Sequence, residues 1–452
     1  MALNEELDVL AQNSMLNTLY TQICCCYSIS GPSSHSAIVK SLNDGLEKLS
    51  ASFPWVAGRT TANESGDYRI IPFEKTPLLV VRDLRQDPSA ATMKALREAN
   101  FPMEMLDESL ICPRSTLPGV FEGVAPENYP VMLVQANFIE GGLLLCILGL
   151  HSTMDMVGQG TLMSLLSKAC RNEPFSEEEI SSVNLARASL VPLLDDSYQP
   201  GPELAYQIAK PAPPESDTSP ASPPPNSTWA YFDFSPTSLA SLKDLATKSA
   251  TLTSGYISTD DSLAALIWQS IARARLPRLG STTNSTLARA VDVRRYLGIP
   301  GSYPGMLQNM TYHTYTLDEI VDMPLGAIAS QLRKAVDPKT SSLAYNTRAL
   351  TTYYSRPTTD RSRVGITATC DPSSDIMLSS WAKVDCYSLD FGLEIGKPES
   401  VRRPRFTPFE SLLYLMPRSR EGMIGAAICL REEDMERLRG DGEFTKLAEF
   451  VG

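Results

Sequence analysis

The stretch Leu148-Gly-Leu-His-Ser-Thr-Met-Asp-Met-Val-Gly158 joins an apolar run to a helical pattern, and it carries one of only three histidines in the chain. The run before it, from Gly142 to Leu150, is almost continuously apolar, as expected of a strand that is buried on both faces. After Asp155, apolar residues recur at helical spacing from Met156 to Ala169. The sequence therefore predicts a strand, a turn that holds His151 and Asp155, and a helix.

The turn is the first candidate for chemistry. Segments that join regular elements carry function more often than the elements themselves. Imidazole titrates near neutrality, so His151 is the natural general base of the chain. A lone histidine is more often a satisfied buried group than a catalyst, and the spacing alone leaves both interpretations open. Asp155, four residues on, could orient the histidine because residues four apart on a helix share a face.

Length and composition indicate an acidic protein of two domains. A chain of 452 residues exceeds one ordinary core. The 40 basic and 52 acidic residues give a net charge of −12, which argues against a broad nucleic-acid surface. No apolar run is long enough to span a bilayer, and the first six residues are acidic where a signal peptide would be basic. We expect a cytoplasmic protein with no membrane or nucleic-acid partner.

The nine cysteines are scattered through mostly apolar stretches, a pattern typical of reduced core thiols. The triplet Cys24-Cys25-Cys26 is not expected to bind a metal. Adjacent residues of a strand face opposite sides, and no histidine or Cys-x-x-Cys pair lies nearby. The sequence therefore predicts no metal site.

A proline-rich segment divides the chain. Nine prolines between Pro200 and Pro225 exclude a continuous helix or a central strand. We therefore expect a first domain over 1–195, a crossover linker over 196–228 and a second domain over 229–452. Both halves alternate strand-like and helical patterns, which indicates a mixed α/β fold. Strands are expected over 78–81, 131–138, 143–150, 287–293, 410–417 and 425–430, and helices over 36–50, 160–170, 236–249 and 259–275, with Asp260 or Asp261 as a cap of the last.

A second polar constellation is Asp390-Phe-Gly-Leu-Glu-Ile-Gly-Lys-Pro398. Two glycines and a proline within nine residues indicate a loop whose backbone turns tightly. Asp-x-Gly is a common turn signal, so this segment by itself indicates only a turn.

Taken together, three motifs resemble those of the BAHD-type acyl-CoA-dependent acyltransferases over essentially the whole chain. They are the His-x-x-x-Asp of the first half, the Asp-Phe-Gly-x-x-x-Gly of the second, and the strand-like Phe53-Pro-Trp-Val-Ala-Gly-Arg59. The chain departs from the family pattern at Val157-Gly158 and at Leu393-Glu-Ile-Gly396, which narrows the resemblance to a fungal branch.

Four segments are similar to the fungal enzymes of this family that acetylate the C-3 hydroxyl of trichothecenes: Leu166–Asn172, Tyr303–His313, Met377–Val384 and Gly396–Pro404. The resemblance implies two similar domains of the chloramphenicol-acetyltransferase type, with a tunnel between them. Acyl-CoA would enter from one face and the alcohol from the other, with His151 midway. It also implies a monomer that holds no bound cofactor and uses acetyl-CoA as co-substrate.

The resemblance implies a role for each motif residue. His151 would take the proton of the alcohol as the hydroxyl oxygen attacks the thioester directly. Asp155 would point away from the tunnel and pair with an arginine, for which Arg294 is the candidate and Arg295 the alternative. In the second motif Asp390 would be structural, with turn residues Gly392 and Gly396.

The resemblance also suggests which residues stabilise the oxyanion and which residues bind the CoA phosphates. The oxyanion of the transition state needs a donor, which Trp381, Ser379 or Ser380 would supply from the tunnel wall. The CoA phosphates are expected to contact basic residues near the second motif, namely Lys397, Arg402 and Arg403. These three could equally be solvated surface charges.

The resemblance thus implies an acetyl-CoA-dependent O-acetyltransferase that esterifies a secondary hydroxyl of a trichothecene-like sesquiterpenoid, which would lower the toxicity of that compound to the cell that makes it. One alternative is an acyltransferase for another fungal secondary-metabolite alcohol. A catalytically silent ligand-binding relative is the other, against which the intact His151 and Asp155 argue. A serine hydrolase is disfavoured because no Gly-x-Ser-x-Gly elbow is present.

Overall fold

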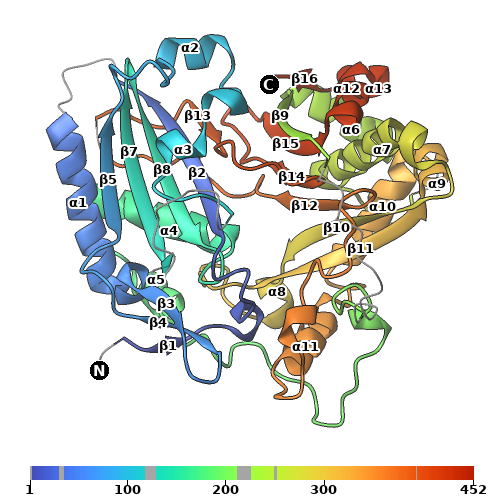
Figure 1. The fold of residues 1–452 in the computed structure, drawn as a ribbon, viewed down its shortest axis with the longest axis horizontal. Helices are drawn as coiled ribbons and strands as arrows, with labels where there is room; N and C mark the ends of the chain where they lie inside the picture. Colours follow the sequence, from blue (N-terminus) through green and yellow to red (C-terminus); the bar gives the residue numbers. More distant parts are fainter. Residues whose placement is uncertain (1–2, 30–34, 118–128, 211–224, 249–251, 393) are drawn as a thin grey trace, which may run out of the picture.

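The computed structural model describes residues 3–29, 35–117, 129–210, 225–248, 252–392 and 394–452. Two large β-sheets stand side by side, each covered by helices (Figure 1). A five-stranded sheet is built mainly from the first half of the chain, and a seven-stranded sheet is built from the second half. A four-stranded sheet completes the fold.

The five-stranded sheet has the order β13-β2-β8-β7-β5. Its central strand β8 (Gly142–Leu150) is buried along its whole length, as its apolar sequence predicts. One face packs on α1 (His35–Ser52) and α4 (Met156–Cys170), and the opposite face packs on the shorter helices α2 and α3. The remaining bounds are β2 Tyr20–Ser28, β5 Leu78–Asp83, β7 Met132–Ile139, β13 Ser400–Arg402, α2 Met93–Glu98 and α3 Glu108–Ile111.

The seven-stranded sheet has the order β11-β10-β12-β14-β15-β9-β16, and its inner strands form one core with the long helix α7 (Thr259–Leu279). Its strands are β9 Ser227–Phe234, β10 Asn284–Asp292, β11 Gln308–Thr316, β12 Ile376–Ser380, β14 Leu412–Leu415, β15 Ile424–Arg431 and β16 Glu449–Phe450. The helices of this half are α6 Pro236–Thr247, α8 Arg294–Leu297, α9 Leu317–Asp322, α10 Leu325–Val336, α11 Leu343–Tyr354, α12 Glu432–Gly440 and α13 Gly442–Thr445.

The four-stranded sheet lies below the N-terminal core and has the order β1-β4-β3-β6. Its strands are β1 Glu5–Glu6, β3 Arg59–Ala62, β4 Tyr68–Ile71 and β6 Tyr129–Pro130, and the remaining helix is α5 Glu177–Val183. Short 3-10 turns complete the described elements at Val9–Ala11, Pro54–Ala57, Met103–Met105, Pro202–Leu204 and Arg361–Arg363.

Two local expectations were wrong. The strand-like segment Phe53–Arg59 forms a 3-10 turn over Pro54–Ala57, and β3 begins only at Arg59. Helix α7 is capped by Ser258 rather than by Asp260 or Asp261. Ser258 accepts from the backbone N–H of Asp261, whose side chain in turn accepts from the backbone N–H of Ser258, so the helix starts two or three residues earlier than an Asp260 or Asp261 cap would place it.

The expected division at 196–228 does not separate the two sheets cleanly. Strand β9 already begins at Ser227, and β13 from the second half pairs antiparallel with β2 of the first. Within the predicted linker, Leu204 packs against α11. The part of the predicted linker over 211–224 lies outside the described residues.

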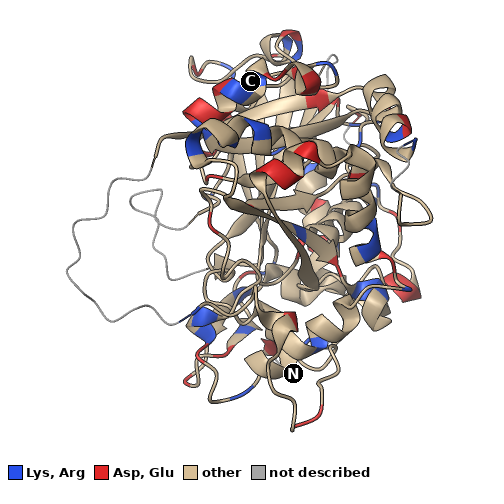
Figure 2. Ribbon diagram, turned by 90° about the vertical axis from the view of Figure 1, so that its right-hand side faces the viewer, with Lys and Arg blue, Asp and Glu red and all other residues tan. Residues whose placement is uncertain are grey.

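The cysteines of the triplet in β2 divide between two cores, since Cys24 and Cys26 pack on one side of the sheet and Cys25 on the other. Among the described residues, no group of three or more histidine, cysteine or acidic side chains could hold a metal ion. No described helix is both long and apolar enough to cross a membrane. Figure 2 shows basic and acidic residues interspersed over the side of the molecule that it presents.

Candidate active site

His151 lies directly after β8, where its backbone N–H donates to the carbonyl of Leu19 at 2.8 Å. Its ring Nδ1 lies 3.3 Å from the carbonyl oxygen of Met154. A carbonyl can only accept, so Nδ1 carries the proton and Nε2 keeps its lone pair. The turn therefore presents a neutral imidazole with Nε2 as a free base.

The surroundings of His151 favour the neutral ring. Burial lowers the pKa of the imidazole below its ordinary value, and the cation of Arg403 acts in the same direction. The Met154 carbonyl and the Asp155 carboxylate oppose this shift without reversing it. The histidine is consequently in its base form near neutral pH.

Asp155 makes contacts that hold the turn in place. Its Oδ1 caps α4 by accepting from the backbone N–H of Gly158 at 2.9 Å. Its Oδ2 accepts from the backbone N–H of Leu307 at 3.0 Å and lies 2.9 Å from Nη2 of Arg294. The carboxylate thus supports the loop and does not hydrogen-bond the His151 ring.

Arg294 is the partner of Asp155, as expected, and each nitrogen of its guanidinium has an oxygen partner. Its Nε donates to the carbonyl of Tyr303 at 2.7 Å, and its Nη1 lies 2.8 Å from Asp292. The alternative, Arg295, instead donates to the carbonyl of Val336 at 2.8 Å. Because Asp155 begins α4 while Arg294 follows β10, their ion pair ties the first half of the chain to the second.

Gly158 permits close packing at the same junction. A Cβ at this position would lie 1.8 Å from the carbonyl oxygen of Pro304. No side chain fits in that gap, because the obstacle is backbone. The glycine therefore allows the first turn of α4 to approach the segment that carries Leu307.

The Asp-Phe-Gly segment is an internal turn that packs on α4. Asp390 accepts from the backbone N–H of Gly392 at 2.9 Å, and the Asp390 carbonyl accepts from the hydroxyl of Ser167 at 2.8 Å. Gly392 and Gly396 have φ values of 65° and 72°, in the left-handed region that favours glycine. Phe391 is buried, edge-on to the ring of Tyr27.

The three oxyanion candidates have different surroundings. The indole N–H of Trp381 donates to the hydroxyl of Ser379 at 3.0 Å, so it is already engaged. The hydroxyl of Ser380 donates to Asp260. Ser379 and Ser380 are neighbours on β12 and therefore face opposite sides of the sheet.

The three basic residues expected at the CoA phosphates do not lie together. Lys397 is exposed. Arg402 is buried, and its guanidinium lies 2.8 Å from Asp233 and donates to the carbonyl of Phe101 at 3.2 Å, contacts that fit a structural role better than phosphate binding. Arg403 is buried among the aromatic rings of Trp381, Phe406 and Tyr414, where a solvated phosphate would not reach it without displacing them.

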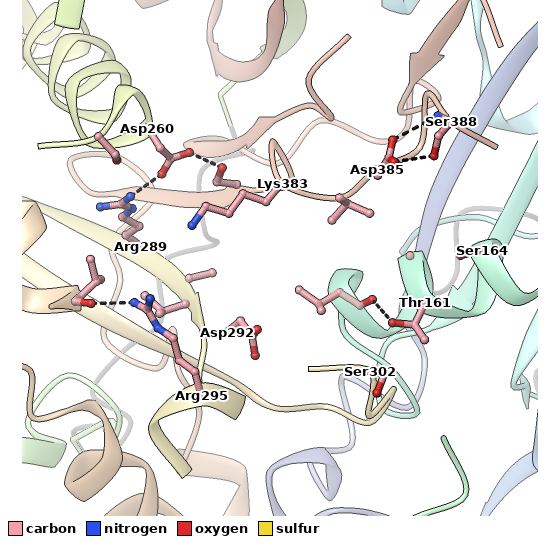
Figure 3. A pocket seen from close by; sticks show the side chains of 18 of the residues that line it. Thr161, Ser164, Asp260, Arg289, Asp292, Arg295, Ser302, Lys383, Asp385 and Ser388 are labelled. Carbon is pink, nitrogen blue, oxygen red and sulfur yellow. Dashed lines mark hydrogen bonds and ion pairs between the residues drawn. The ribbon is translucent and has the colours of Figure 1, made fainter. Parts of the chain in front are cut away.

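A cavity of about 570 Å³ opens between α4 and the β10–β12 side of the second half (Figure 3). Its cations are Arg289, Arg295, Arg333 and Lys383. Figure 3 shows Lys383 and Arg295 on different walls of the same space. Arg289 and Arg333 form ion pairs with carboxylates, whereas Lys383 and Arg295 form none with the described residues.

Sequence reasoning missed Arg289, Arg333 and Lys383 as cavity residues. Arg289 does leave a signal, because a charged residue interrupts the apolar strand pattern of β10. Its ion pairs with Asp260 and Asp261 explain how that charge is tolerated. No comparable signal marks Lys383, which becomes a cavity residue only because the loop after β12 folds against α4.

Comparison with known proteins places the chain in a family. Residues 19–170 match a model of the trichothecene 3-O-acetyltransferase-like N-terminal domain, and residues 115–445 match the Transferase family. An O-acetyltransferase of Cryptosporiopsis sp. (strain 8999) is 54% identical and covers 100% of this chain and 98% of its own. Trichothecene 3-O-acetyltransferase of Fusarium sporotrichioides is 52% identical over 99% of this chain and 97% of its own.

Solved structures agree. The crystal structure of the F. sporotrichioides enzyme complexed with coenzyme A and T-2 has a TM-score of 0.91 and 50% identity, covering 99% of this chain and 100% of that one. Vinorine synthase has a TM-score of 0.69 at 17% identity, covering 99% of this chain and 94% of that one, and shows the shared fold. The chain therefore belongs to the BAHD-like Transferase family, with the two-domain fold of the chloramphenicol-acetyltransferase type, and is an O-acetyltransferase that uses acetyl-CoA as co-substrate.

Proposed function

We propose that this enzyme acetylates a secondary hydroxyl of a trichothecene-like sesquiterpenoid, at C-3 by resemblance, with His151 as the general base. The geometry of His151 carries the proposal, because Nδ1 is held by the Met154 carbonyl while Nε2 is free to accept a proton. The full-length similarity to trichothecene 3-O-acetyltransferase supports the choice of acceptor. Solved relatives complexed with T-2 or deoxynivalenol support it further.

The reaction needs one base and no covalent enzyme intermediate. Nε2 of His151 takes the hydroxyl proton while the hydroxyl oxygen bonds to the thioester carbonyl carbon. The carbon–sulfur bond then breaks, and CoA leaves as a thiolate. The imidazolium returns its proton to that sulfur, which regenerates the neutral base. A secondary alcohol is a poor nucleophile without this step, and the lowered pKa of His151 keeps the ring unprotonated and able to accept the proton near neutral pH.

Asp155 acts in this proposal as a positioning residue. It fixes the start of α4 against Arg294 and Leu307, and the turn that carries His151 is fixed with it. A base displaced by about 1 Å can lose about 100-fold in rate. Asp390, Gly392 and Gly396 likewise serve the fold, since their contacts shape the turn that packs on α4.

We place the CoA phosphates in the cavity of Figure 3, between Lys383 and Arg295, in place of Lys397 and Arg402. Both cations lack a carboxylate partner among the described residues, so a phosphate would not have to displace one. A ligand pocket of a few hundred Å³ bounded by a few fixed polar groups is typical of cofactor sites. Ser258 and Ser302 add hydroxyls to its walls.

Steady-state kinetics with the purified chain test the acceptor and the base together. Acetyl-CoA is supplied with a panel of trichothecenes and other fungal alcohols, and free thiol is measured. We expect trichothecenes with a free C-3 hydroxyl to stimulate thiol release, and His151→Ala to abolish the stimulation while the variant keeps the parent's far-UV circular dichroism. Equal rates for His151→Ala and the parent would contradict the mechanism.

The CoA assignment has its own variants. We expect Lys383→Met and Arg295→Met each to raise KM for acetyl-CoA several-fold with little change in kcat, and to weaken the dependence of KM on salt. Lys94→Met is the matched control, because Lys94 is an exposed lysine of α2 whose contact is with Glu98. An increase of KM in Lys397→Met but not in Lys383→Met would overturn the assignment.

A second acceptor class is favoured by one observation. The Cryptosporiopsis relative is as similar to this chain as the trichothecene enzyme is, and its name specifies only an O-acetyltransferase. Stimulation by another fungal alcohol in the same panel, with none by trichothecenes, would favour this alternative.

A further inference from the structure

Arg187 is a buried arginine that contacts the turn carrying His151. It lies in the loop after α5 and is 2% exposed. Its Nη1 donates to the backbone carbonyl of Thr153 at 2.7 Å. Thr153 is fully buried, and among the described residues Arg187 is the only donor to that carbonyl. A buried carbonyl without a donor is costly, so the turn depends on this contact.

Acidic and aromatic side chains hold the guanidinium of Arg187 in place. Its Nε donates to Glu5 of β1 at 3.1 Å, and Asp8 lies 3.7 Å from its Nη1. The guanidinium carbon also lies 4.3 Å from the ring centre of Trp55. A guanidinium is planar and its donors have a fixed geometry, so contacts on its other sides determine where Nη1 points. The N-terminal segment thereby fixes the donor that holds Thr153.

The same cluster extends to Arg294, the partner of Asp155. The hydroxyl of Tyr303 donates to Asp8 at 2.8 Å. The carbonyl of Tyr303 accepts from Nε of Arg294 at 2.7 Å. Arg187 and Arg294 therefore belong to one network of hydrogen bonds and ion pairs, which joins the two halves of the chain behind the turn.

Met154 lies between the two residues of the turn that this network holds. Its carbonyl is 3.3 Å from Nδ1 of His151 and keeps the proton on that nitrogen. Arg187 fixes the peptide group that precedes Met154, and the anchored Asp155 follows it directly. A rotation of the peptide after Thr153 would move the Met154 carbonyl away from the imidazole. The orientation and the tautomer of His151 therefore depend on both anchors.

We propose that Arg187 is a second positioning residue of the reaction, which holds the Thr153 carbonyl so that Met154 keeps Nε2 of His151 free. The inference rests on the proposed function, in which His151 is the base. Arg187 acts through the backbone of the turn, whereas Asp155 acts through the start of α4.

The alternative is an arginine that serves stability alone by joining the N-terminal segment to the core. Its ion pairs with Glu5 and Asp8 fit that role as well. The two roles differ in what they predict for each folded molecule. Loss of a merely structural arginine lowers the fraction of folded enzyme and leaves kcat per folded molecule unchanged. Loss of a positioning residue lowers kcat itself.

Kinetics of Arg187→Met in the full-length chain, with rates divided by the fraction of folded enzyme, test the inference. A base displaced by about 1 Å can lose about 100-fold in rate, and we expect kcat to fall by about that factor. Arg187 is not among the residues that line the cavity of Figure 3. KM for acetyl-CoA and for the alcohol should therefore change by less than about threefold.

The matched control is Arg275→Met. Arg275 is fully buried in the second half of the chain and pairs with Asp434. Its Nη1 donates to the backbone carbonyls of Ser374 and Asp375 at 2.8 and 3.0 Å. The variant removes a buried arginine with the same kinds of partner, away from the turn. We expect it to lose stability and to keep kcat within about threefold of the parent.

The tautomer of His151 supplies a readout that a merely structural role would not move. The chain has three histidines, so histidine labelled with ¹⁵N gives three sets of imidazole signals, and His151→Gln assigns one of them. We expect the Nδ1–H form in the parent and in Arg275→Met. In Arg187→Met we expect both tautomers, because the Met154 carbonyl is no longer held in line with Nδ1.

Arg187→Lys keeps the buried charge and decides the question should Arg187→Met fail to fold. A lysine has one nitrogen, whereas the arginine presents Nε to Glu5 and Nη1 to Thr153. We expect Arg187→Lys to regain most of the parent's resistance to urea and yet to remain at least about tenfold below the parent in kcat.

Two outcomes would overturn the inference while leaving the proposed function intact. One is a folded Arg187→Met or Arg187→Lys variant whose kcat lies within about threefold of the parent. The other is a loss of kcat with His151 still wholly in the Nδ1–H form. An Nε2–H tautomer in the parent, or equal rates for His151→Ala and the parent, would instead overturn the proposed function.

Discussion

Removal of the Asp155 carboxylate should cost the protein stability as well as activity. In Asp155→Ala, the buried Arg294 loses one of its two carboxylates, and the backbone N–H groups of Gly158 and Leu307 lose their acceptor. Breaking a buried ion pair costs about 3–5 kcal/mol, and loss of a helix cap costs about 1 kcal/mol. Asp292 remains 2.8 Å from Arg294, so we expect a total loss of about 3–5 kcal/mol in the free energy of unfolding rather than the full sum.

Urea unfolding followed by tryptophan fluorescence measures this loss. A double-mutant cycle with Arg294→Met should give a coupling of about 1–3 kcal/mol, because the two side chains act through one contact. The matched control is Asp292→Asn. Its carboxylate is 37% exposed and contacts the same arginine, so the expected change is about 1 kcal/mol or less.

The reasoning would be refuted by an Asp155→Ala variant that loses activity but unfolds at the urea concentration of the parent. Such a result would mean that Asp155 acts on the chemistry of His151 rather than on the turn. A crystal structure with the Asp155 carboxylate hydrogen-bonded to the His151 ring would lead to the same conclusion.

Three further predictions follow from the same site. Burial lowers the pKa of His151, so kcat/KM should stay level as the pH falls to 6.5, the ordinary pKa of histidine, and should decline only below that pH, where the base becomes protonated. A decline of kcat/KM centred above pH 6.5 would contradict this prediction. Gly158→Ala should lower both stability and kcat, because its methyl group would meet the Pro304 carbonyl; urea unfolding and initial rates check this, and a variant with the parent's values would not agree with the packing. Arg402→Met should cost about 3–5 kcal/mol of unfolding free energy by stranding Asp233, while KM for acetyl-CoA stays unchanged in the molecules that remain folded; a raised KM at parental stability would return Arg402 to the CoA site.

Local patterns in the sequence were sufficient for the strand and the helix on either side of His151. The apolar run before His151 became the fully buried β8, and the helical spacing after Asp155 became α4. Such periodicities are properties of neighbouring residues, so they can be read without a structure. The cap of α7 was misplaced because a reciprocal pair, Ser258 with Asp261, competed with a single aspartate.

Contacts between distant segments were beyond local patterns. Strand β13 pairs with β2 of the N-terminal sheet, so residues about 375 positions apart in the chain become neighbours. No pattern within the short segment Ser400–Arg402 predicts this pairing. The pairing of β13 with β2 also determines which groups the adjacent residues Arg402 and Arg403 contact. The side chain of Arg402 pairs with Asp233, whereas that of Arg403 packs among the aromatic rings of Trp381, Phe406 and Tyr414. Adjacent residues on a strand point to opposite sides, so only the place of the strand says what each one meets.

The sequence by itself determined the strand–turn–helix unit that carries His151, the proposed base, and, through resemblance, the family. It did so because His151 and the flanking apolar periods are local and chemically distinctive. Only the tertiary structure decided which tautomer His151 holds, that Asp155 supports the turn through Arg294, and which cations line a cavity. Hydrogen bonds, burial and ion pairing depend on which distant groups the fold brings within a few ångströms, and sequence spacing does not encode those distances.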